Sequence, residues 1–411
     1  MAPSHVKASI LHGARDLRLE DRPLDPLGPH DVLVAVKTTG LCGSDLHYYS
    51  HFRNGDILVR EPLTLGHESA GVVTAVGSEV STLRVGDRVA LEVGQPCEKC
   101  TLCVAGRYNI CPEMRFRSSA KAVPHAQGTL QEVIVHPEKW CHKLPDSVTL
   151  PEAALAEPLA VAIHAFHRAS PLPPRAKVLV LGAGTVGLLC AAAARAMGDQ
   201  AYVLVADVQA DRVKFAVENG FADGGFVVPV SSTPPPVGGG GGGVQQQQQQ
   251  QQQGIEEKLK RARELAGRIG ETEIRKKVGD GDGEVERLGL VDVVFECTGV
   301  EACLQAAIYA TQPGGKVLII GMGNPVQTLP VSAAAQREVD LVGVFRYKHT
   351  YPQAIELMRL RKEAAVSHLP DVTKLITHRF RGLEEVPRAF DMAARAKDEE
   401  GRLVLKVMVE M

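Results

Sequence analysis

Four cysteines lie close together in the stretch Cys97-x2-Cys100-x2-Cys103-x7-Cys111. Four thiolates at such short spacings can surround one zinc ion tetrahedrally and leave no coordination position open, which is the arrangement of a structural zinc site. An iron–sulfur cluster is the alternative, but the bacterial cluster motif has three residues before its fourth cysteine and this stretch has seven. The spacing therefore predicts structural zinc, with reduced, metal-free thiols as the remaining interpretation.

A glycine-rich turn points to a second kind of chemistry. Gly182-Ala183-Gly184-Thr185-Val186-Gly187 follows an apolar run at 177–181 and opens an alanine-rich stretch. In a strand–turn–helix unit these glycines make the tight turn, admit a pyrophosphate and let helix and strand pack closely. Asp207 lies 20 residues beyond Gly187, where its carboxylate can accept both ribose hydroxyls and would repel a 2′-phosphate. The motif predicts a dinucleotide site for NAD.

Arg212 is ambiguous in this respect, because an arginine near the motif can also serve the 2′-phosphate of NADP. Its other interpretations are stacking on the adenine ring or an exposed position on a helix. Asp207 decides the prediction in favour of NAD.

Groups in three separate segments suggest a second metal site. Cys42 lies in Gly40-Leu41-Cys42-Gly43-Ser44-Asp45, His67 and Glu68 follow Gly66, and Glu157 precedes Pro158. A thiolate, an imidazole and carboxylates can hold a zinc ion that keeps one position for water or substrate. Taken alone, Cys42 is more typical of a small buried side chain, and His67 of a core histidine. Their spacing along the chain does not by itself show that these residues form one site.

The elements that must position these groups differ along the chain. Short β segments separated by Gly, Pro and Asp fill residues 5–140, which predicts an irregular β-rich domain with strands at 32–37, 70–76, 88–92 and 130–135. Beyond Glu157, apolar strands alternate with helices, which predicts a doubly wound parallel sheet. Its strands are expected at 177–181, 202–206, 291–295, 316–320 and 341–344, with helices at 186–197 and 212–219.

One segment does not fit this alternation. Residues 231–254 contain Pro234 to Pro236, six consecutive glycines and nine consecutive glutamines. Such a composition cannot bury apolar surface, so we expect a disordered loop inside the nucleotide-binding domain, followed by an exposed charged helix at 255–268. Long loops cost little entropy, so we interpret the insertion as a tolerated surface feature.

Composition narrows the class of protein. The net charge of −2 gives no indication of a nucleic-acid partner or a membrane surface, and the longest apolar runs have the length of strands. Residues 1–14 carry polar residues throughout and lack the apolar core of a secretory signal. Nine cysteines, four of them crowded together, then favour metal binding over disulfides. We therefore expect a soluble, cytoplasmic enzyme.

Longer motifs connect the scattered residues. Gly66-His67-Glu68-x2-Gly71-x5-Gly77-x2-Val80, with Gly86-Asp87-Arg88-Val89 behind it, resembles the zinc signature of the medium-chain alcohol dehydrogenases. Within that superfamily the chain resembles the sorbitol/xylitol (polyol) dehydrogenase group, and its fungal members most closely. Residues 228–285 fall outside the resemblance, which rests on further stretches at 42–48, 106–109, 141–146, 157–159, 296–301, 337–340 and 343–347.

The resemblance implies an α/β fold with two domains. A β-rich, GroES-like catalytic domain is expected at 1–160, with the structural zinc lobe at about 95–113. A Rossmann domain that binds NAD is expected at 161–330, including the insertion at 231–254. Residues 331–411 would return to the catalytic domain, and the protein would form a homotetramer.

The resemblance also implies residue roles. Cys42, His67 and Glu68 match the protein ligands of the catalytic zinc, and Glu157 would hold the zinc-bound water or act as a ligand in some states. Ser44 would accept the alcohol proton, which then passes through the cofactor ribose towards His47 or His51, two histidines that we do not rank. The cofactor residues would be Gly182, Gly184, Thr185, Val186, Gly187, Asp207 and Arg212, and the structural zinc ligands Cys97, Cys100, Cys103 and Cys111.

Four residues fall at substrate-pocket positions of the family: Tyr48, Phe116, Arg346 and Tyr347. Each has a plainer alternative, since Phe116 could belong to the core and Arg346 to an interface ion pair. The resemblance implies an enzyme with two zinc ions per chain that uses NAD to oxidise sorbitol to fructose and xylitol to xylulose. Alternatives are L-arabinitol 4-dehydrogenase, a threonine or simple alcohol dehydrogenase, or a non-catalytic cofactor-binding relative, although such relatives lose the metal ligands that this chain keeps.

Overall fold

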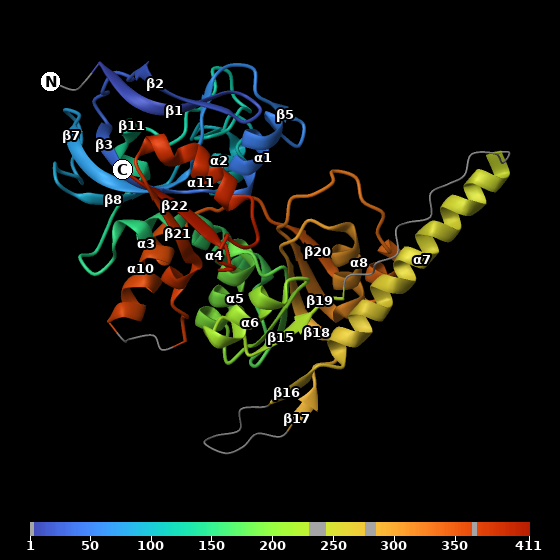
Figure 1. Ribbon diagram of the computed structural model, residues 1–411. Helices are drawn as coiled ribbons and strands as arrows, with labels where there is room; N and C mark the ends of the chain where they lie inside the picture. The colour runs from blue at the N-terminus through green and yellow to red at the C-terminus, as the bar shows by residue number, and fades with distance from the viewer. Residues whose placement is uncertain (1–3, 230–243, 276–284, 364–367) are drawn as a thin grey trace. The chain divides into compact units, whose positions relative to one another are not determined.

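The computed structural model describes residues 4–229, 244–275, 285–363 and 368–411. The chain forms two compact units (Figure 1): unit 1 comprises Met1–His164 and Phe345–Met411, and unit 2 comprises Ala165–Val344. The return to the first unit comes at Phe345, later than the predicted residue 331. The reason is that α9 (Val331–Ala335) and β20 (Asp340–Gly343) still belong to unit 2, where β20 is the edge strand of the parallel sheet.

Unit 1 is built on a seven-stranded, largely antiparallel sheet with β3 (Asp31–Gly40) near its centre. The valines of β3 are buried, as expected for a strand covered on both faces. β3 pairs with β7, β11 and β22, and the register places Gly40 opposite both Glu68 and Met408. The other strands of this sheet are β7 (Glu68–Val76), β8 (Arg88–Leu91), β11 (Val133–Pro137), β12 (Cys141–Lys143), β21 (Ile376–Arg381) and β22 (Lys406–Glu410).

Three smaller sheets and several helices complete unit 1. The small sheets join β1 (His5–Gly13), β2 (Asp16–Pro23) and β6 (Leu63–Thr64), then β4 (Arg53–Asn54) and β5 (Ile57–Leu58), then β9 (Gly94–Gln95) and β10 (Arg115–Phe116). The helices are α1 (Gly43–His51), α2 (Thr101–Val104), α3 (Leu150–Ala154), α10 (Tyr351–Lys362) and α11 (Val386–Ala393), with 3₁₀ turns at Tyr108–Ile110, Glu138–Trp140, Val372–Leu375 and Leu383–Glu385. Helix α4 (Ala156–Ala169) carries the chain from unit 1 into unit 2. The prediction of a β-rich first domain is confirmed.

Unit 2 contains a six-stranded sheet in which every pairing is parallel. Its order, β15-β14-β13-β18-β19-β20, is the 3-2-1-4-5-6 order of a doubly wound dinucleotide-binding fold. Strands β13, β14, β18 and β19 bury Leu179, Leu204, Val294 and Val317 in one core, which explains their continuous apolar sequences. The strands are β13 (Lys177–Leu181), β14 (Tyr202–Asp207), β15 (Gly224–Val227), β18 (Val291–Glu296) and β19 (Thr311–Ile319), with helices α5 (Thr185–Met197), α6 (Ala210–Glu218) and α8 (Glu301–Ala310).

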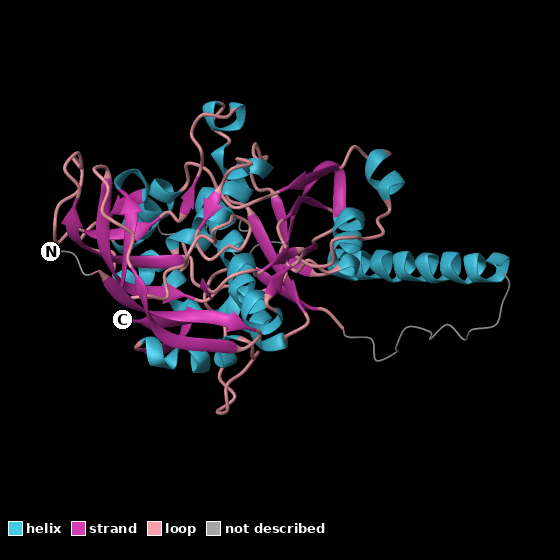
Figure 2. Cartoon of the chain, turned by 90° about the horizontal axis from the view of Figure 1, so that it is seen from above, coloured by secondary structure: helices cyan, strands magenta, loops and turns pink. Residues whose placement is uncertain are grey.

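Helix α7 (Val244–Gly270) corrects one prediction. The expected loop at 231–254 is wrong from Val244 onward, where the chain is helical, and residues 230–243 lie outside the described residues. Glutamine is a good helix former, so the glutamine run can extend the charged helix that the sequence predicts at 255–268. In Figures 1 and 2 the N-terminal part of α7 extends away from the sheet of unit 2, whereas Ala262, Ala266 and Ile269 near its other end are buried. A two-stranded ribbon, β16 (Glu273–Arg275) and β17 (Val285–Arg287), follows α7.

The helices of the described chain include none that combines the length and apolarity needed to span a membrane.

Deleting residues 233–253 and joining the ends with a short Gly-Ser linker should leave kcat/KM within about twofold and the melting temperature within about 2 °C. The reason is that Gln252 and Gln253 are exposed, while the core contacts of α7 begin further along the helix. Steady-state kinetics and thermal unfolding test this expectation. As a control, Ile269→Ala removes a buried side chain and should destabilise the protein by about 2–5 kcal/mol. A large loss of turnover in a folded deletion variant would show that the insertion serves the reaction.

Candidate active site and metal centres

Cys42, His67 and Glu68 converge in unit 1, with one ligand atom from each lying within 4.8 Å of the other two. Cys42 caps the N-terminus of α1, and Glu68 begins β7 opposite Gly40, the last residue of β3. A Cβ atom at Gly40 would lie 2.3 Å from Glu68 Oε2, so a side chain there would displace the Glu68 carboxylate. This close approach of strand ends joins three residues that spacing alone could not join. Their chemistry fits a zinc site that keeps a position for water or substrate.

A buried carboxylate lies behind His67. Asp45 Oδ1 is 3.2 Å from His67 Nδ1, and Asp45 also accepts hydrogen bonds from Gly66 N and Ser118 Oγ. With Nδ1 engaged in this way, Nε2 is the nitrogen left for a metal. Burial by itself lowers the pKa of His67, but the Asp45 carboxylate outweighs burial and holds that pKa well above its usual value. A metal that binds His67 must therefore displace a proton.

Glu68 has a buried partner of opposite charge in Lys406. Lys406 Nζ lies 2.7 and 2.6 Å from the two carboxylate oxygens of Glu68 and donates to the Leu41 carbonyl at 3.0 Å. Lys406 is only 3% exposed, and an ammonium group buried to this extent needs such partners. Sequence reasoning missed Lys406 and Asp45. A signal existed for Lys406, which interrupts the apolar run Leu403-Val404-Leu405-Lys406-Val407-Met408-Val409 in the sequence.

Glu157 lies in the first turn of α4 and is buried. It is not part of the set of ligand atoms that lie mutually within 4.8 Å. Burial raises the pKa of Glu157 to about 7, the His67 charge opposes this shift, and the Glu68 charge adds to it. The charges of His67 and Glu68 that act on Glu157 indicate that its carboxyl group lies near the ligand set. Its predicted role as an occasional ligand stays a prediction.

Aromatic rings connect the metal centre to Arg346. The His67 and Phe116 ring centroids are 5.5 Å apart, and the Arg346 guanidinium carbon lies 3.7 Å from the centroid of Phe116. Burial lowers the pKa of Arg346 to about 10, a value at which the group is still a cation at neutral pH. Tyr347 is buried, and its hydroxyl has no polar partner in the described chain besides the neighbouring Tyr351. The residues predicted for the substrate pocket therefore gather beside the metal ligands.

Tyr48 and the proton-relay candidates lie on α1. Tyr48 packs in a hydrophobic cluster, and its hydroxyl accepts a hydrogen bond from Ala120 N at 3.3 Å, which leaves its own proton available. Ser44 is half-buried in the first turn of α1. His47 and His51 are exposed, with ring centroids 6.2 Å apart. This arrangement again does not rank the two histidines.

The four cysteines of the lobe form the second centre. Their sulfurs lie within 4.8 Å of one another, with Cys100 Sγ at 3.5 Å from Cys103 Sγ and 3.9 Å from Cys111 Sγ. A tetrahedral zinc with bonds of about 2.3 Å places its sulfurs about 3.8 Å apart, so the lobe fits the metal. Hydrogen bonds from the Lys99 and Cys100 backbone lower the pKa of the Cys97 thiol to about 7, which favours the thiolate. All nine cysteines of the chain are free.

The glycine-rich turn of unit 2 has the geometry that a dinucleotide requires. It links β13 to α5, with Gly184 as the N-cap and Thr185 and Val186 in the first turn. Gly187 cannot carry a side chain, because a Cβ atom there would lie 1.8 Å from the Gly182 carbonyl oxygen. This close contact lets α5 pack tightly against the turn, which is the role of the third glycine in a dinucleotide-binding motif.

Asp207 and Arg212 lie at this turn. Asp207 ends β14 and accepts hydrogen bonds from Ala183 N at 2.6 Å and Gln209 N at 2.8 Å. A Cβ atom on Gly184 would lie 3.9 Å from Arg212 Nη1, and the buried Nε of Arg212 has no hydrogen-bond partner in the described chain. Both side chains thus lie beside the glycine-rich turn, and their predicted roles towards a cofactor stay predictions.

Comparisons with known proteins match this chain to family models and to whole proteins. The alcohol dehydrogenase GroES-like domain model matches residues 28–146, the zinc-binding dehydrogenase model matches 253–359, and the C-terminal domain model of alanine dehydrogenase/PNT matches 168–267. Sorbitol dehydrogenase of Arabidopsis thaliana is 40% identical over 98% of this chain and 95% of that protein. The chain belongs to the zinc-containing medium-chain dehydrogenase family. Within this family it stands in the polyol dehydrogenase group, and it uses Zn²⁺ and a nicotinamide dinucleotide.

Two further similarities are to L-idonate 5-dehydrogenases. L-idonate 5-dehydrogenase of Vitis vinifera is 38% identical over 98% of this chain and 94% of that protein. The solved structure of L-idonate 5-dehydrogenase from Escherichia coli has a TM-score of 0.77 at 23% identity and covers 99% of this chain and 98% of that one. The latter similarity shows the α/β fold of the family.

The two centres predict different consequences of losing a ligand. Metal analysis of the wild type should give two zinc ions per chain. Cys100→Ser should lose one zinc ion and lower the melting temperature by on the order of 10 °C, because a closed four-thiolate site contributes directly to folding. Cys42→Ala should abolish turnover while the fold survives, since its site is open and catalytic.

Cys303→Ala is the matched control, because Cys303 lies on α8 outside both ligand sets and should keep two zinc ions. Wild-type protein with a single zinc ion would eliminate one of the two sites.

Asp207→Ser should narrow the preference for NAD over NADP by about tenfold to a hundredfold, because the wild-type carboxylate repels the 2′-phosphate by about 1–3 kcal/mol. The ratio of kcat/KM with the two cofactors measures the preference. Glu218→Ser removes the same charge at an exposed position of α6 and should leave the ratio unchanged. Equal use of both cofactors by the wild type would contradict the role given to Asp207.

Proposed function

We propose that this enzyme oxidises the C2 hydroxyl of small polyols, converting sorbitol to fructose and xylitol to xylulose with NAD. The observation that carries the proposal is the position of Arg346 and the buried Tyr347 beside the metal ligands, where the Tyr347 hydroxyl has no polar partner in the described chain besides the neighbouring Tyr351. A buried hydroxyl with so few partners favours a substrate that offers hydroxyl groups. The sorbitol dehydrogenases among the relatives support the same substrate class.

We assign one zinc ion to Cys42, His67 and Glu68 and one to the four cysteines of the lobe, and by family analogy we expect a homotetramer. When bound, the first zinc ion supplies a Lewis acid that makes a hydroxyl group more acidic, and NAD supplies a hydride acceptor. Asp45 keeps the His67 ring in place and its Nδ1 occupied. Lys406 orients the Glu68 carboxylate. These two buried pairs keep the ligand set preorganised.

The remaining residues handle protons and substrate hydroxyls. Ser44 is placed in the first turn of α1 beside Cys42, where it can accept the proton that leaves the substrate. Glu157, with a pKa of about 7, can hold a proton or release it near neutral pH. Arg346 and Tyr347 donate hydrogen bonds to the hydroxyls that do not react. A short alcohol leaves these donors unpaired, and such mismatches discriminate by about 10⁴ or more.

A sugar acid is the second candidate substrate. L-idonate 5-dehydrogenase of Vitis vinifera is a relative at 38% identity, and the buried Arg346 cation stacks on Phe116 and Phe345. A guanidinium group in this setting suits a carboxylate as well as a hydroxyl. L-idonate therefore belongs in the substrate panel beside sorbitol, xylitol and L-arabinitol.

Arg346→Leu should lower kcat/KM for sorbitol by about 10²–10³ and change the weak activity on 2-butanol by less than about threefold. The reason is that only the polyol uses the guanidinium group. Initial rates of NADH formation on both substrates measure the effect, with ethanol expected to be a very poor substrate.

Arg346→Lys is the conservative control and should retain part of the sorbitol activity, since it keeps a cation but loses the planar fork. A proportional loss on both substrates would assign Arg346 to the structure. Equal wild-type activity on ethanol and sorbitol would remove the polyol assignment.

A further inference from the structure

The loop at residues 345–350, which precedes α10, carries Arg346 and Tyr347 in a strained backbone. Arg346 has φ = 52° and His349 has φ = 55°, both in the left-handed region that residues with a side chain rarely adopt. Such conformations persist only where surrounding contacts impose them. The contacts that hold this loop therefore decide where the substrate-binding side chains lie.

Two residues of the cysteine lobe supply those contacts. Asn109 Nδ2 donates to the carbonyl of Phe345 at 2.8 Å, immediately before the strained Arg346. The Tyr108 hydroxyl accepts a hydrogen bond from His349 N, the second strained residue, at 2.7 Å. Tyr108 and Asn109 are buried, and they lie between the third and fourth cysteines of the lobe. A side chain of the lobe thus forms a hydrogen bond with the backbone at, or directly before, each strained residue.

Tyr108 is itself oriented by a buried acceptor. Its hydroxyl donates to Glu92 Oε1 at 2.7 Å, while the other Glu92 oxygen lies 2.7 Å from His142 Nε2. The phenol ring lies 5.2 Å from the Trp140 ring and meets His349 edge-on at 4.8 Å. Because its only proton is committed to Glu92, the Tyr108 oxygen offers a lone pair to the loop.

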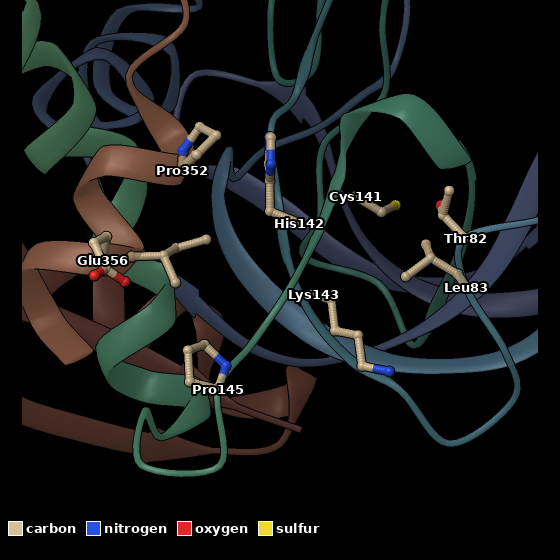
Figure 3. A pocket seen from close by; sticks show the side chains of 9 residues that line it. Thr82, Leu83, Cys141, His142, Lys143, Pro145, Pro352 and Glu356 are labelled. Carbon is tan, nitrogen blue, oxygen red and sulfur yellow. The ribbon is translucent and has the colours of Figure 1, made fainter.

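Other contacts hold the end of the loop that enters α10. A pocket of about 420 Å³ borders the beginning of this helix, lined by His142 on β12 and by Pro352 and Glu356 on α10 (Figure 3). Beside it, Tyr351 is buried and donates to the Leu91 carbonyl at 2.7 Å, and Thr350 Oγ1 donates to the Ala160 carbonyl at 3.0 Å. The hydrogen bonds from the lobe hold the other part of the loop, at Phe345 and His349.

We propose that Tyr108 and Asn109 are positioning residues, through which the cysteine lobe holds Arg346 and Tyr347 in the conformation that binds polyols. This inference rests on the proposed function for its choice of substrate. Neither residue touches the reacting atoms, so their loss affects the affinity for a polyol more than the chemical step.

The test compares Asn109→Leu, which keeps the size of the side chain but removes the donor, with Tyr108→Phe. We expect each variant to retain two zinc ions, to raise KM for sorbitol about tenfold, and to change kcat/KM for 2-butanol less than twofold. Hydrogen–deuterium exchange of peptides covering residues 345–350 should become faster in both variants. Asn219→Leu is the matched control, because the Asn219 amide also donates to a backbone carbonyl, that of Phe215, in unit 2. It should leave exchange of the loop and KM unchanged.

The exchange readout separates this proposal from the proposed function. If the wild type oxidised no polyol, the proposed function would fail, while faster exchange of residues 345–350 would still support the positioning role. Unchanged exchange in both variants overturns the proposal, whatever the substrate. A proportional fall of both activities with unchanged exchange, or loss of a zinc ion together with the melting temperature, assigns Tyr108 and Asn109 to lobe stability alone.

Discussion

The buried ion pair between Lys406 and Glu68 is the interaction on which the catalytic centre depends. Both side chains lie almost entirely out of water, and the ammonium group meets both carboxylate oxygens within 2.7 Å. Removing one member of such a pair leaves an uncompensated buried charge, at a typical cost of about 3–5 kcal/mol. The pair also joins the beginnings of β7 and β22 at the point where β3 ends, next to Cys42. This one ion pair therefore joins strands of the sheet and also holds a member of the ligand set in place.

The same principle of paired buried charge extends outward from this centre. Asp45 balances His67, and Glu92 accepts from Tyr108 and lies against His142. Arg346 differs, because it rests on the faces of Phe116 and Phe345 instead of a carboxylate. Aromatic faces stabilise a guanidinium group without saturating its donors. The paired buried charges therefore have their partners within the fold, whereas the hydrogen-bond donors of Arg346 remain available to a substrate.

The cysteine lobe links stability to specificity in this arrangement. A closed metal site usually has a structural role alone, since it offers no open coordination position. Here the residues between its cysteines reach the loop that carries Arg346 and Tyr347. A strained backbone conformation persists only where surrounding contacts maintain it. A segment that is fixed by a metal site can supply such contacts through hydrogen bonds, whereas a loop without them cannot. The lobe thereby contributes to the substrate site without contacting the substrate.

The sequence alone determined those features whose residues are neighbours along the chain. The four cysteines, the glycine-rich turn with Asp207, and the alternating strands of unit 2 are local patterns, and the structure confirms the folds that they predict. The loop that composition predicted is wrong from Val244 onward. A glutamine run without apolar residues is compatible with a helix as well as with a disordered loop. The resemblance to a family grouped Cys42, His67 and Glu68, which spacing could not do.

Only the tertiary structure decided the partners of these groups. Lys406 is 338 positions from Glu68, and Tyr108 is 241 positions from His349. Contacts over such separations depend on strand register and on where loops turn, and neither is encoded in a local pattern. The sequence therefore determined which chemistry the chain carries, whereas the packing of distant segments decided which charges are balanced and which are left for a substrate.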